Sequence, residues 1–551
     1  MNRYDRSKCG MALFCPRIDR EIHNRETGGN RVGGMFRVSD TGIKDRESSA
    51  STRHRGSPRI PPQSRTSRLR SLCNENQWLA LSASILVIAG ASCVFFFRGP
   101  LFSHYEHVVL SLQGSTSLGD ELMPQLAAAF LRDEMGAQET GFRVAGKDTK
   151  GHSYLHVWGR VPGRSGLQVI QIYASGSGAA FECLAAESGW NSCDIGMASR
   201  PINDLDKEIY PALRNIGDRG TEHVVALDGI AIIVNPYNPI SQLSIPELRA
   251  IYTGQIANWK DVGGIDAPIE LYGRDRNSGT FEMFMEKVIG KDTISNVESS
   301  DIPLDHQIGD SSLIVDSVMR STNAIGYVSS PMIKGAKALP ISDGSGPAFP
   351  PTELSIVTED YPICRRLLLY DWDAPGSLMN AFVRYVVYKP GQTLVAQTPF
   401  VELTPKIFPV VPPQNAPAAY KHIASKYSRI GLSFHFSSEQ VDATTDSTNQ
   451  LDNLARVNVL RLRTFLAQRG GTGDDILLIG FADEHEGGLP SENLAHKRSE
   501  SVATSLRAIG VIVPSQNIRD FGSDLPVASN DTPEGRRKNR RVEAWVRNAL
   551  Q

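Results

Sequence analysis

The sequence predicts an α/β protein of several folded units that follow one membrane-spanning helix. Three observations support this prediction. The chain has 551 residues, 40% of them hydrophobic and 21% charged, which is typical of globular domains. Apolar strand-like runs alternate with amphipathic helices over residues 104–402, the pattern of an α/β domain. Residues 77–97 form a run of 21 residues without a charge.

Charge is distributed unevenly along the chain. The net charge is only −2, yet residues 1–76 contain 16 Lys and Arg against 8 Asp and Glu. This segment therefore carries +8 and the rest of the chain −10. Residues 1–76 are also rich in Arg, Ser, Gly and Pro and lack apolar periodicity, which predicts a disordered, basic cytoplasmic tail.

Residues 77–98 are predicted to form a single transmembrane helix. At about 1.5 Å per residue, the 21 uncharged residues 77–97 would span roughly 31 Å as a helix, which matches the hydrocarbon core of a bilayer. Arg65, Arg68 and Arg70 precede it, so the positive-inside rule places the N-terminus in the cytoplasm. A cleaved signal peptide and a buried core helix are the alternatives, but a signal peptide has a shorter basic start and a shorter apolar run. We expect an inner-membrane anchor with the main domains in the periplasm.

Three cysteines lie in the predicted periplasmic part. Cys183 and Cys193 are ten residues apart and could form a disulfide in an oxidising compartment, or could stay reduced. Cys364 would be left over in either case.

Three loops rich in Ser, Thr and Gly each precede a predicted helix. They are residues 114–117, 175–178 and 274–280, and in the last loop Arg274 stands four residues before Ser278. The first N–H groups of a helix lack intrahelical partners and its dipole is positive there, so such loops suit anions. One such loop is more often only a helix cap. Three of them favour a convergent oxyanion site.

Further motifs follow the loops in order: residues 194–200 (DIGMASR), 227–236 (LDGIAIIVNP), 251–254 (IYTG) and 324–328 (AIGYV). With these motifs, residues 111–401 resemble the periplasmic phosphate-binding proteins of the PstS type, the receptors of phosphate ABC transporters. The resemblance implies two hinged α/β lobes that close on an anion, with an ABC permease as partner. It implies phosphate donors at Thr116, Ser117, Ser177, Arg274, Ser278, Gly279 and Thr280.

Two positions depart from the phosphate-specific pattern of that family. Arg200 stands where the pattern has an Asp that accepts the proton of hydrogen phosphate, and Arg276 replaces a second acidic residue. A carboxylate at the first position would repel fully ionised sulfate, whereas an arginine does not. The expected ligand is therefore phosphate or a related oxyanion.

The C-terminal part carries a second set of motifs: residues 480–483 (GFAD), 494–498 (LAHKR), 522–528 (GSDLPVA) and 539–543 (NRRVE). Residues 428–551 thereby resemble the OmpA-like peptidoglycan-binding domain, after a Pro- and Ala-rich linker at 403–427. The resemblance implies that Asp483 and Arg498 grip the diaminopimelate of the peptidoglycan stem peptide. A carboxylate suits the ammonium of that group and a guanidinium its carboxylate. A surface salt bridge between the two residues is the alternative.

Two segments resemble enzyme motifs but lack residues that those motifs require. Residues 141–147 mimic a P-loop, but Asp148 stands where Ser or Thr must bind magnesium. The acidic loop 483–486 lacks metal-ligand spacing. We therefore expect no enzyme, with no catalytic residue, metal or cofactor. The basic run 536–541 would suit nucleic acid, but a periplasmic location argues against that partner.

Together these features predict a protein that captures phosphate in the periplasm for ABC-type uptake or sensing while fixed to the inner membrane and to peptidoglycan. The alternative is a structural tether from membrane to cell wall whose binding domain has lost or changed its ligand. The predicted architecture is a two-lobed periplasmic-binding-protein fold and a smaller α/β domain. Its parts are the cytoplasmic tail (1–76), the transmembrane helix (77–98), the two-lobed binding domain (104–402), the linker (403–427) and the OmpA-like domain (428–551).

Overall fold

The computed structural model describes residues 105–551, except for the short segments given at the end of this paragraph. These residues belong to one compact unit, Arg98–Gln551. The predicted tail and the predicted transmembrane helix lie outside the described residues. Among the residues that are described, no helix is both long and apolar enough to span a bilayer. The segments left out are 149–151, 187–191, 218–219, 276–277, 291–305, 309, 373, 437–450, 485–489 and 549–551.

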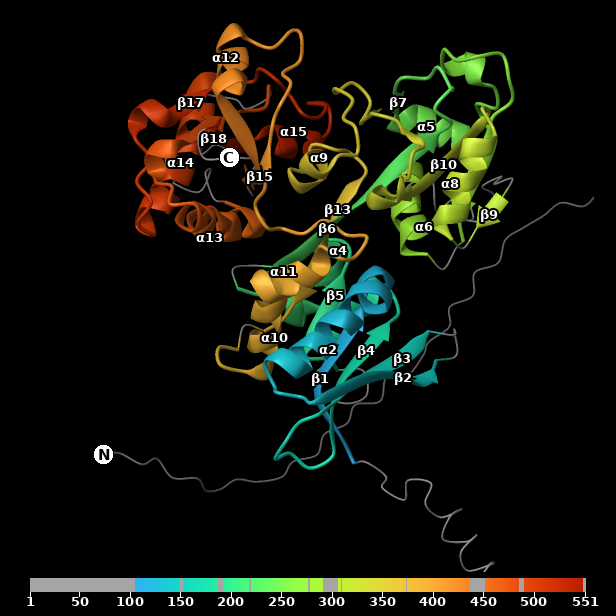
Figure 1. The fold of residues 1–551 in the computed structure, drawn as a ribbon, viewed down its shortest axis with the longest axis vertical. Coiled ribbons are helices and arrows are strands. Elements are labelled where there is room, and N and C mark those ends of the chain that lie inside the picture. Colours follow the sequence, from blue (N-terminus) through green and yellow to red (C-terminus); the bar gives the residue numbers. More distant parts are fainter. Residues whose placement is uncertain are drawn as a thin grey trace, which may run out of the picture. The chain divides into compact units, whose positions relative to one another are not determined.

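The largest element is an eleven-stranded sheet, with strand order β2-β3-β4-β1-β5-β13-β6-β10-β8-β9 and β11 paired to β6 (Figure 1). The strands of its first half are short or medium in length and are largely apolar where they are central. Their bounds are β1 Glu106–Gly114, β2 Glu139–Lys147, β3 Ser153–Arg160, β4 Leu167–Ala174 and β5 Ile195–Ala198. Those of the second half are β8 Glu270–Arg274, β9 His306–Ile308, β10 Ala324–Ser329 and β11 Lys337–Ala338.

Two strands, the long β6 (Glu222–Val234) and the shorter β13 (Cys364–Tyr370), connect the two halves of this sheet. The first part of β6 pairs with β13 in antiparallel fashion, and its last five residues pair with β10. Almost every residue of β6 is buried, because the strand is covered on both faces. We call the β1–β5 side the first lobe, the β8–β11 side the second lobe, and the paired strands β6 and β13 the hinge.

Helices cover the first lobe. The stripe Leu126, Phe130 and Leu131 of α2 is fully buried and packs in the same core as Phe382 of α10. The N-terminal turn of this helix, η1, is a π-helical turn that runs directly into α2. The bounds are η1 Ser117–Leu122, α2 Met123–Asp133, α3 Ser177–Ala185, α4 Asp204–Ile209, η2 Pro211–Leu213, α10 Leu378–Val387 and α11 Lys389–Val395.

The second lobe has its own helices. The apolar side chains Phe281, Phe284, Met285, Val288 and Ile289 are buried, and Gly290 ends the helix with a positive φ of 86°. The bounds are α5 Ile245–Tyr252, η3 Trp259–Val262, α6 Gly279–Phe284, η4 Met285–Ile289, α8 Ser311–Arg320, η5 Ser330–Met332 and α9 Glu353–Val357. A two-stranded sheet joins β7 Leu243–Ser244 to β12 Ile341–Ser342.

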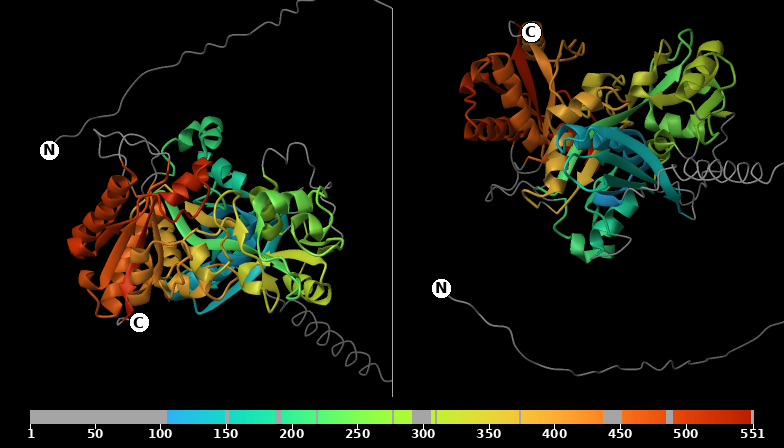
Figure 2. Two further views of the ribbon diagram at one scale, coloured as in Figure 1. Left: turned by 90° about the horizontal axis from the view of Figure 1, so that it is seen from above. Right: turned by 60° about the horizontal axis from the view of Figure 1, so that its bottom comes forward.

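Residues 403–548 form the C-terminal region, built on a five-stranded sheet of order β14-β15-β18-β16-β17. One face packs in a single apolar cluster with α13 and α14, and the other packs with Tyr420 of α12. Figure 2 shows this region in orange and red, with helices beside its strands. The strands are β14 Ile407–Phe408, β15 Tyr427–His435, β16 Ile476–Gly480, β17 Ile518–Asp520 and β18 Arg541–Arg547. The helices are α12 Ala418–Lys426, α13 Asn453–Gln468, η7 Gly473–Asp475, α14 Ser491–Ala508, η8 Ser515–Asn517 and α15 Pro533–Asn539.

The segment expected to be a linker, residues 403–427, is built into this region. Ile407 and Phe408 pair with β15 as an edge strand. Tyr420 packs its ring edge-on against Phe481, Phe521 and Trp545 and is 5% exposed. The prediction of a linker was therefore wrong, because apolar side chains within this Pro- and Ala-rich segment pack on the C-terminal sheet.

Candidate functional site

The first predicted loop leaves β1 at Gly114, whose φ is +137°. A Cβ on this residue would lie 2.0 Å from the Met197 carbonyl oxygen, so only glycine allows the chain to turn here. The turn brings Ser117, only 3% exposed, to the start of η1.

The second loop lies beside the first one. The Gly114 carbonyl accepts hydrogen bonds from the Ser175 N–H at 2.8 Å and the Gly176 N–H at 2.9 Å. Ser177 opens α3, and its hydroxyl lies 2.9 Å from that of Ser199 and accepts from the Ser199 N–H at 3.0 Å. The ends of β1, β4 and β5 are thus joined at one edge of the first lobe.

The third loop supplies the second lobe's side of the site. The Ser278 hydroxyl caps α6 by accepting from the Thr280 N–H at 3.2 Å. The Thr280 hydroxyl lies 3.3 Å from that of Ser329 at the end of β10. Arg274, the last residue of β8, donates from Nη1 to Ser311 Oγ at 2.8 Å. Arg276 lies outside the described residues.

A buried ion pair in the hinge completes the site. Arg365 of β13 and Asp228 of β6 are 4% and 5% exposed, and Arg365 Nε donates to Asp228 Oδ2 at 3.1 Å. Burial raises the pKa of Asp228, and the Arg365 guanidinium counteracts that rise. Arg365 Nη2 also donates to Ser117 Oγ at 2.8 Å and to the Gly279 carbonyl at 3.0 Å. One guanidinium therefore joins the hinge, the first lobe and the second lobe.

The two lobes are closed on one another at this point. A Cβ built on Gly279 would lie 2.2 Å from Ser117 Oγ, so the loops meet in direct contact. The Thr116 hydroxyl donates to Glu282 Oε2 across the lobes at 3.3 Å. The structure thus brings the predicted residues of the first and third loops together, and it places the Ser177 loop beside them.

Both arginines of the site keep a buried N–H donor without a partner in the described part of the chain. These donors are Arg274 Nε and Arg365 Nη1. A buried donor without an acceptor costs about 1–3 kcal/mol, and more when it is charged. The site is therefore complementary to an anion that would accept from these donors.

Arg365 and Asp228 were not predicted from the sequence as residues of the site. A signal was present in the sequence, because each interrupts an apolar strand and the two have opposite charges. Only the antiparallel pairing of β6 with β13, in which Arg365 lies opposite Asp228, reveals that they form a pair.

Arg200, the departure noted in the sequence, does not present a free charge to the site. Its Nη1 and Nη2 donate to the two carboxylate oxygens of Asp206 at 2.6 and 2.9 Å. This hydrogen-bonded carboxylate raises the pKa of Arg200. The guanidinium also lies 5.0 Å from the centre of the Phe181 ring. Position 200 thus lacks the carboxylate of the phosphate-specific pattern, and Asp206 neutralises the charge of the arginine found there.

The second predicted pair, Asp483 and Arg498, lies inside the C-terminal region. The two residues are 2% and 1% exposed. Arg540 Nη1 donates to Asp483 Oδ2 at 3.0 Å, while Arg498 Nη1 donates to the Phe481 carbonyl at 3.3 Å. Arg498 also lies 5.6 Å from the centre of the Phe436 ring. In this conformation neither group is on the surface.

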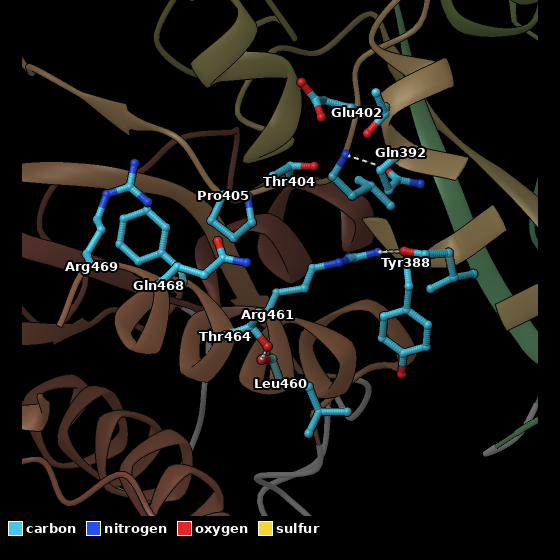
Figure 3. Close-up of a pocket in the computed structure, with 14 residues that line it drawn as sticks. Tyr388, Gln392, Glu402, Thr404, Pro405, Leu460, Arg461, Thr464, Gln468 and Arg469 are labelled. Carbon is cyan, nitrogen blue, oxygen red and sulfur yellow. Dashed lines mark hydrogen bonds between the residues drawn. The ribbon is translucent and has the colours of Figure 1, made fainter. Parts of the chain in front are cut away.

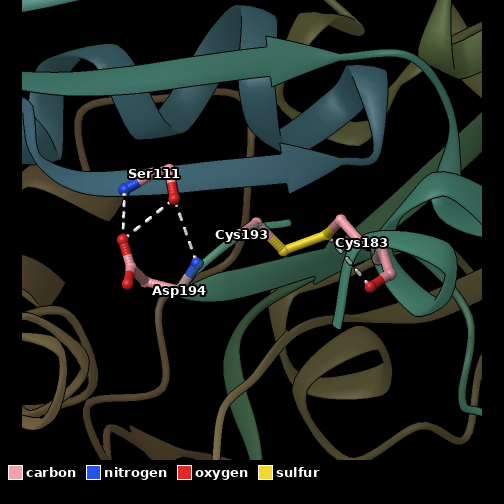
Figure 4. The surroundings of a disulfide bond; sticks show 5 residues. Ser111, Cys183, Cys193 and Asp194 are labelled. Atoms are coloured by element: carbon pink, nitrogen blue, oxygen red, sulfur yellow. Dashed lines mark hydrogen bonds between the residues drawn. A yellow bond between two sulfur atoms is a disulfide. The ribbon is translucent and has the colours of Figure 1, made fainter. Parts of the chain in front are cut away.

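Cys183 and Cys193 form a disulfide, which ties α3 to the segment before β5 (Figure 4). The neighbouring Asp194 is held to β1, because its Oδ2 accepts from the Ser111 N–H at 2.7 Å and from the Ser111 hydroxyl at 2.9 Å. Cys364 is a buried free thiol, and burial raises its pKa to about 11.

A cavity of about 300 Å³ lies between α10, α11 and α13 (Figure 3). Arg461 of α13 extends into it and is 7% exposed. Its guanidinium donates to Asn458 Oδ1 at 3.1 Å and to the carbonyl of Val387, the last residue of α10, at 3.4 Å. Burial lowers the pKa of Arg461 to about 10, so it stays charged at neutral pH and suits the negative end of α10. This contact attaches the C-terminal region to the first lobe.

The part of the chain that forms the two lobes is similar to known proteins. Residues 141–389 match the family model of the PBP superfamily domain. No cluster of metal-ligating side chains occurs in the described residues.

Curated relatives of this region carry the name phosphate-binding protein PstS rather than the name of an enzyme. The relative from Staphylococcus haemolyticus is 28% identical over 229 residues, which is 40% of this chain and 67% of the relative. That from Staphylococcus saprophyticus is 30% identical over 36% of this chain and 59% of its own length. That from Pseudomonas aeruginosa is 28% identical over 43% and 75%. The match thus spans about two thirds or less of the staphylococcal proteins.

Among solved structures, an ABC-type phosphate transport receptor from Vibrio cholerae is 23% identical, with a TM-score of 0.41. The alignment covers 54% of this chain and 99% of the receptor.

Proposed function

We propose that the cleft between the two lobes binds phosphate or a related tetrahedral oxyanion, and that the chain serves an ABC-type phosphate uptake or sensing system as its substrate-binding protein. The observation that carries this proposal is the pair of buried donors, Arg274 Nε and Arg365 Nη1, beside three loops of hydroxyl groups. The curated relatives, which are named as phosphate-binding proteins, support it.

The donors fit a tetrahedral dianion. Thr116, Ser117 and Ser177 would approach it from the first lobe, and Ser278, Gly279 and Thr280 from the second, with Arg274 supplying charge. Each hydrogen bond to a charged group contributes about 1.5–3 kcal/mol net, so several together hold a desolvated anion without a metal. Because Arg365 contacts both loops, an anion that accepted from it would stabilise the closed state over the open one.

Selectivity is expected to be looser than in a binding protein with an acidic residue at position 200. No carboxylate occupies that position, and Asp206 neutralises the arginine there. Fully ionised sulfate would therefore be repelled less than by a binding protein with a carboxylate at position 200.

We further propose that the protein belongs to the cell envelope. Residues 77–98 would anchor it in the inner membrane with residues 1–76 in the cytoplasm, and the disulfide is consistent with an oxidising compartment. The C-terminal region would act as an OmpA-like domain that binds the diaminopimelate of peptidoglycan through Asp483 and Arg498. The ligand's ammonium would then compete with Arg540 for the Asp483 carboxylate.

Calorimetric titration tests the capture role. The full chain is unfolded and refolded to remove bound anion, then titrated with phosphate, sulfate, arsenate and a phosphonate. We expect phosphate binding at micromolar concentration or tighter, with at least a tenfold loss in Arg274→Ala and in Ser278→Ala. The exposed Arg320→Ala serves as matched control and should bind as the wild type does. If folded protein gives no heat of binding with any of these anions, the proposal that the chain captures phosphate is overturned. The alternative, a structural tether between membrane and cell wall, would then remain.

Sedimentation with purified peptidoglycan tests the envelope role separately. We expect Asp483→Asn to reduce the bound fraction, whereas Asp474→Asn, an exposed acidic residue of the same region, should not. Equal sedimentation of the wild type and Asp483→Asn would contradict this role.

A further inference from the structure

The cavity of about 300 Å³ between α10, α11 and α13 is separate from the candidate cleft. None of its lining residues belongs to the three loops or to the hinge, and neither Asp483 nor Arg498 is among them. The lining comes from the end of α10 and from α11, from residues 402–405, and from α13. We call it the α10–α13 cavity.

The α10–α13 cavity is partly apolar and open to solvent. Its buried lining includes the apolar side chains of Val387, Leu403 and Phe465. Two large side chains of the lining, Tyr388 and Leu460, are 43% and 39% exposed. A ligand that enters here would therefore need an apolar body, as is usual for small-molecule pockets.

Arg461 is the buried polar side chain of the lining that can still bind a ligand. The other one, Gln392, uses its amide fully, because Nε2 donates to two backbone carbonyls and Oε1 accepts from the Leu403 N–H. A guanidinium has five N–H groups. Arg461 donates one to Asn458 Oδ1 and one to the Val387 carbonyl, and no other acceptor in the described part of the chain is within reach. Three N–H groups are therefore left for a ligand in the cavity (Figure 3).

The charge of Arg461 is only partly compensated within the described residues. Its two hydrogen-bond acceptors are an amide and a backbone carbonyl, neither of which carries a full charge. The C-terminal end of α10 supplies roughly half of a negative charge. Glu402 lines the same cavity, but its carboxylate is bound by Lys406 at 3.0 Å.

Other buried arginines of the described chain differ from Arg461 in this respect. The pKa is raised in those that bind a carboxylate, namely Arg200, Arg366 and Arg429. Burial lowers the pKa of Arg461 to about 10, and only Tyr388 acts against this effect. No acid, Glu402 included, is among the groups that shift this pKa. A buried cation without a counter-ion is costly, because burial removes its water.

We propose that the α10–α13 cavity binds a small organic monocarboxylate with a compact apolar body, whose carboxylate group is held by Arg461. The two oxygens of a carboxylate fit the planar fork of a guanidinium. One negative charge would compensate the buried cation, whereas a dianion would exceed it. The apolar body would pack on Leu403 and Phe465. Since a water molecule takes up about 30 Å³, the cavity has room for roughly ten non-hydrogen atoms. The bound ligand would touch the first lobe and the C-terminal region and so stabilise their contact.

Equilibrium dialysis of the full chain against labelled phenylacetate, a monocarboxylate of this size, tests the site. Saturating phosphate is present throughout, so that the cleft is not available to the probe. We expect phenylacetate to bind with a Kd of about 1 mM or tighter. Arg461→Met should weaken binding at least tenfold, because charge-assisted hydrogen bonds are lost. Phenylacetamide, which is neutral and has the same shape, should compete at least tenfold less well than unlabelled phenylacetate.

Two further variants serve as control and as second test. Arg463→Met changes an exposed arginine of α13 outside the lining and should bind phenylacetate as the wild type does. Thr464 is an exposed member of the lining, and its hydroxyl donates only within its own helix, to the Leu460 carbonyl at 3.0 Å. Thr464→Trp should therefore keep the fold, fill the cavity and abolish binding, even if Arg461→Met fails to fold.

The outcomes separate this proposal from that for the cleft, because the two sites share no residue. Arg274→Ala/Ser278→Ala should lose phosphate and leave the Kd for phenylacetate unchanged; if it loses phenylacetate, the carboxylate binds in the cleft and the proposal is overturned. It is also overturned if the folded wild type does not bind phenylacetate, or if phenylacetamide competes equally well. Binding at the wild-type level in Thr464→Trp, or in a folded Arg461→Met, would contradict it as well.

Discussion

Arg365 and Asp228 face one another inside the hinge, and each compensates the buried charge of the other. The Arg365 guanidinium also contacts Ser117 and Gly279, so it contributes to both stability and lobe closure. Removing one partner of a buried pair is far more harmful than replacing both, since it leaves an uncompensated buried charge.

We therefore predict that Arg365→Met lowers the free energy of unfolding by about 3–5 kcal/mol. Asp228→Asn/Arg365→Met should be less destabilised, and the exposed Arg320→Met should be close to wild type. Urea unfolding of the full chain measures all three.

The loss in Arg365→Met should also depend on pH. Burial raises the pKa of Asp228 above its unfolded value, and without Arg365 that rise is larger. A carboxyl group with a raised pKa stabilises the fold at low pH and ceases to do so as pH rises through that pKa. The deficit of Arg365→Met should therefore be smaller at pH 5 than at pH 8, and a constant deficit would contradict this explanation.

His435 provides a second residue-level prediction. It is 1% exposed, and burial lowers its pKa to about 4. The unfolded chain takes up a proton near pH 6.5 while the folded one resists it, so stability is fully present above pH 6.5 and declines as pH falls toward 4. We expect His435→Gln to remove up to about 3 kcal/mol of this pH dependence. The exposed His422→Gln should leave the profile of stability against pH unchanged.

At the scale of elements, the disulfide restrains α3, which begins with the candidate ligand Ser177. A closed loop of this size is expected to contribute about 2–4 kcal/mol. We predict that Cys183→Ser/Cys193→Ser lowers the melting temperature to that of the reduced wild type. The variant itself should not respond to reductant. A wild type that melts identically with and without reductant would show that the bond adds no stability.

The elements also show what the sequence could predict. The hydroxyl loops could be predicted from local spacing, and the structure confirms that each loop precedes a helix. The strand β14 could not be predicted, because two residues in a Pro-rich segment have no periodicity of their own. Its pairing with β15 depends on a partner more than 20 residues away. The Asp228–Arg365 pair was missed for the same reason.

At the scale of the molecule, the C-terminal region is attached to both lobes and to the hinge. Asn453 Nδ2 donates to Glu222 Oε1 at 2.9 Å, and Asp452 accepts from Arg366 in the hinge at 2.8 Å. The Ser529 N–H donates to Asp343 Oδ2, on the second-lobe side, at 2.7 Å. Opening of the lobes would disturb some of these contacts, so anion binding and attachment of the C-terminal region are expected to be linked.

In the proposed function, the closed cleft holds an oxyanion on the three loops and Arg274. Phosphorus-31 NMR of the stripped full chain, with two equivalents of phosphate added, tests it most directly. We predict a resonance of bound phosphate that is lost in Arg274→Ala/Ser278→Ala and retained in Arg320→Ala. Identical spectra for the wild type and the cleft variant, with both proteins folded, would contradict the claim.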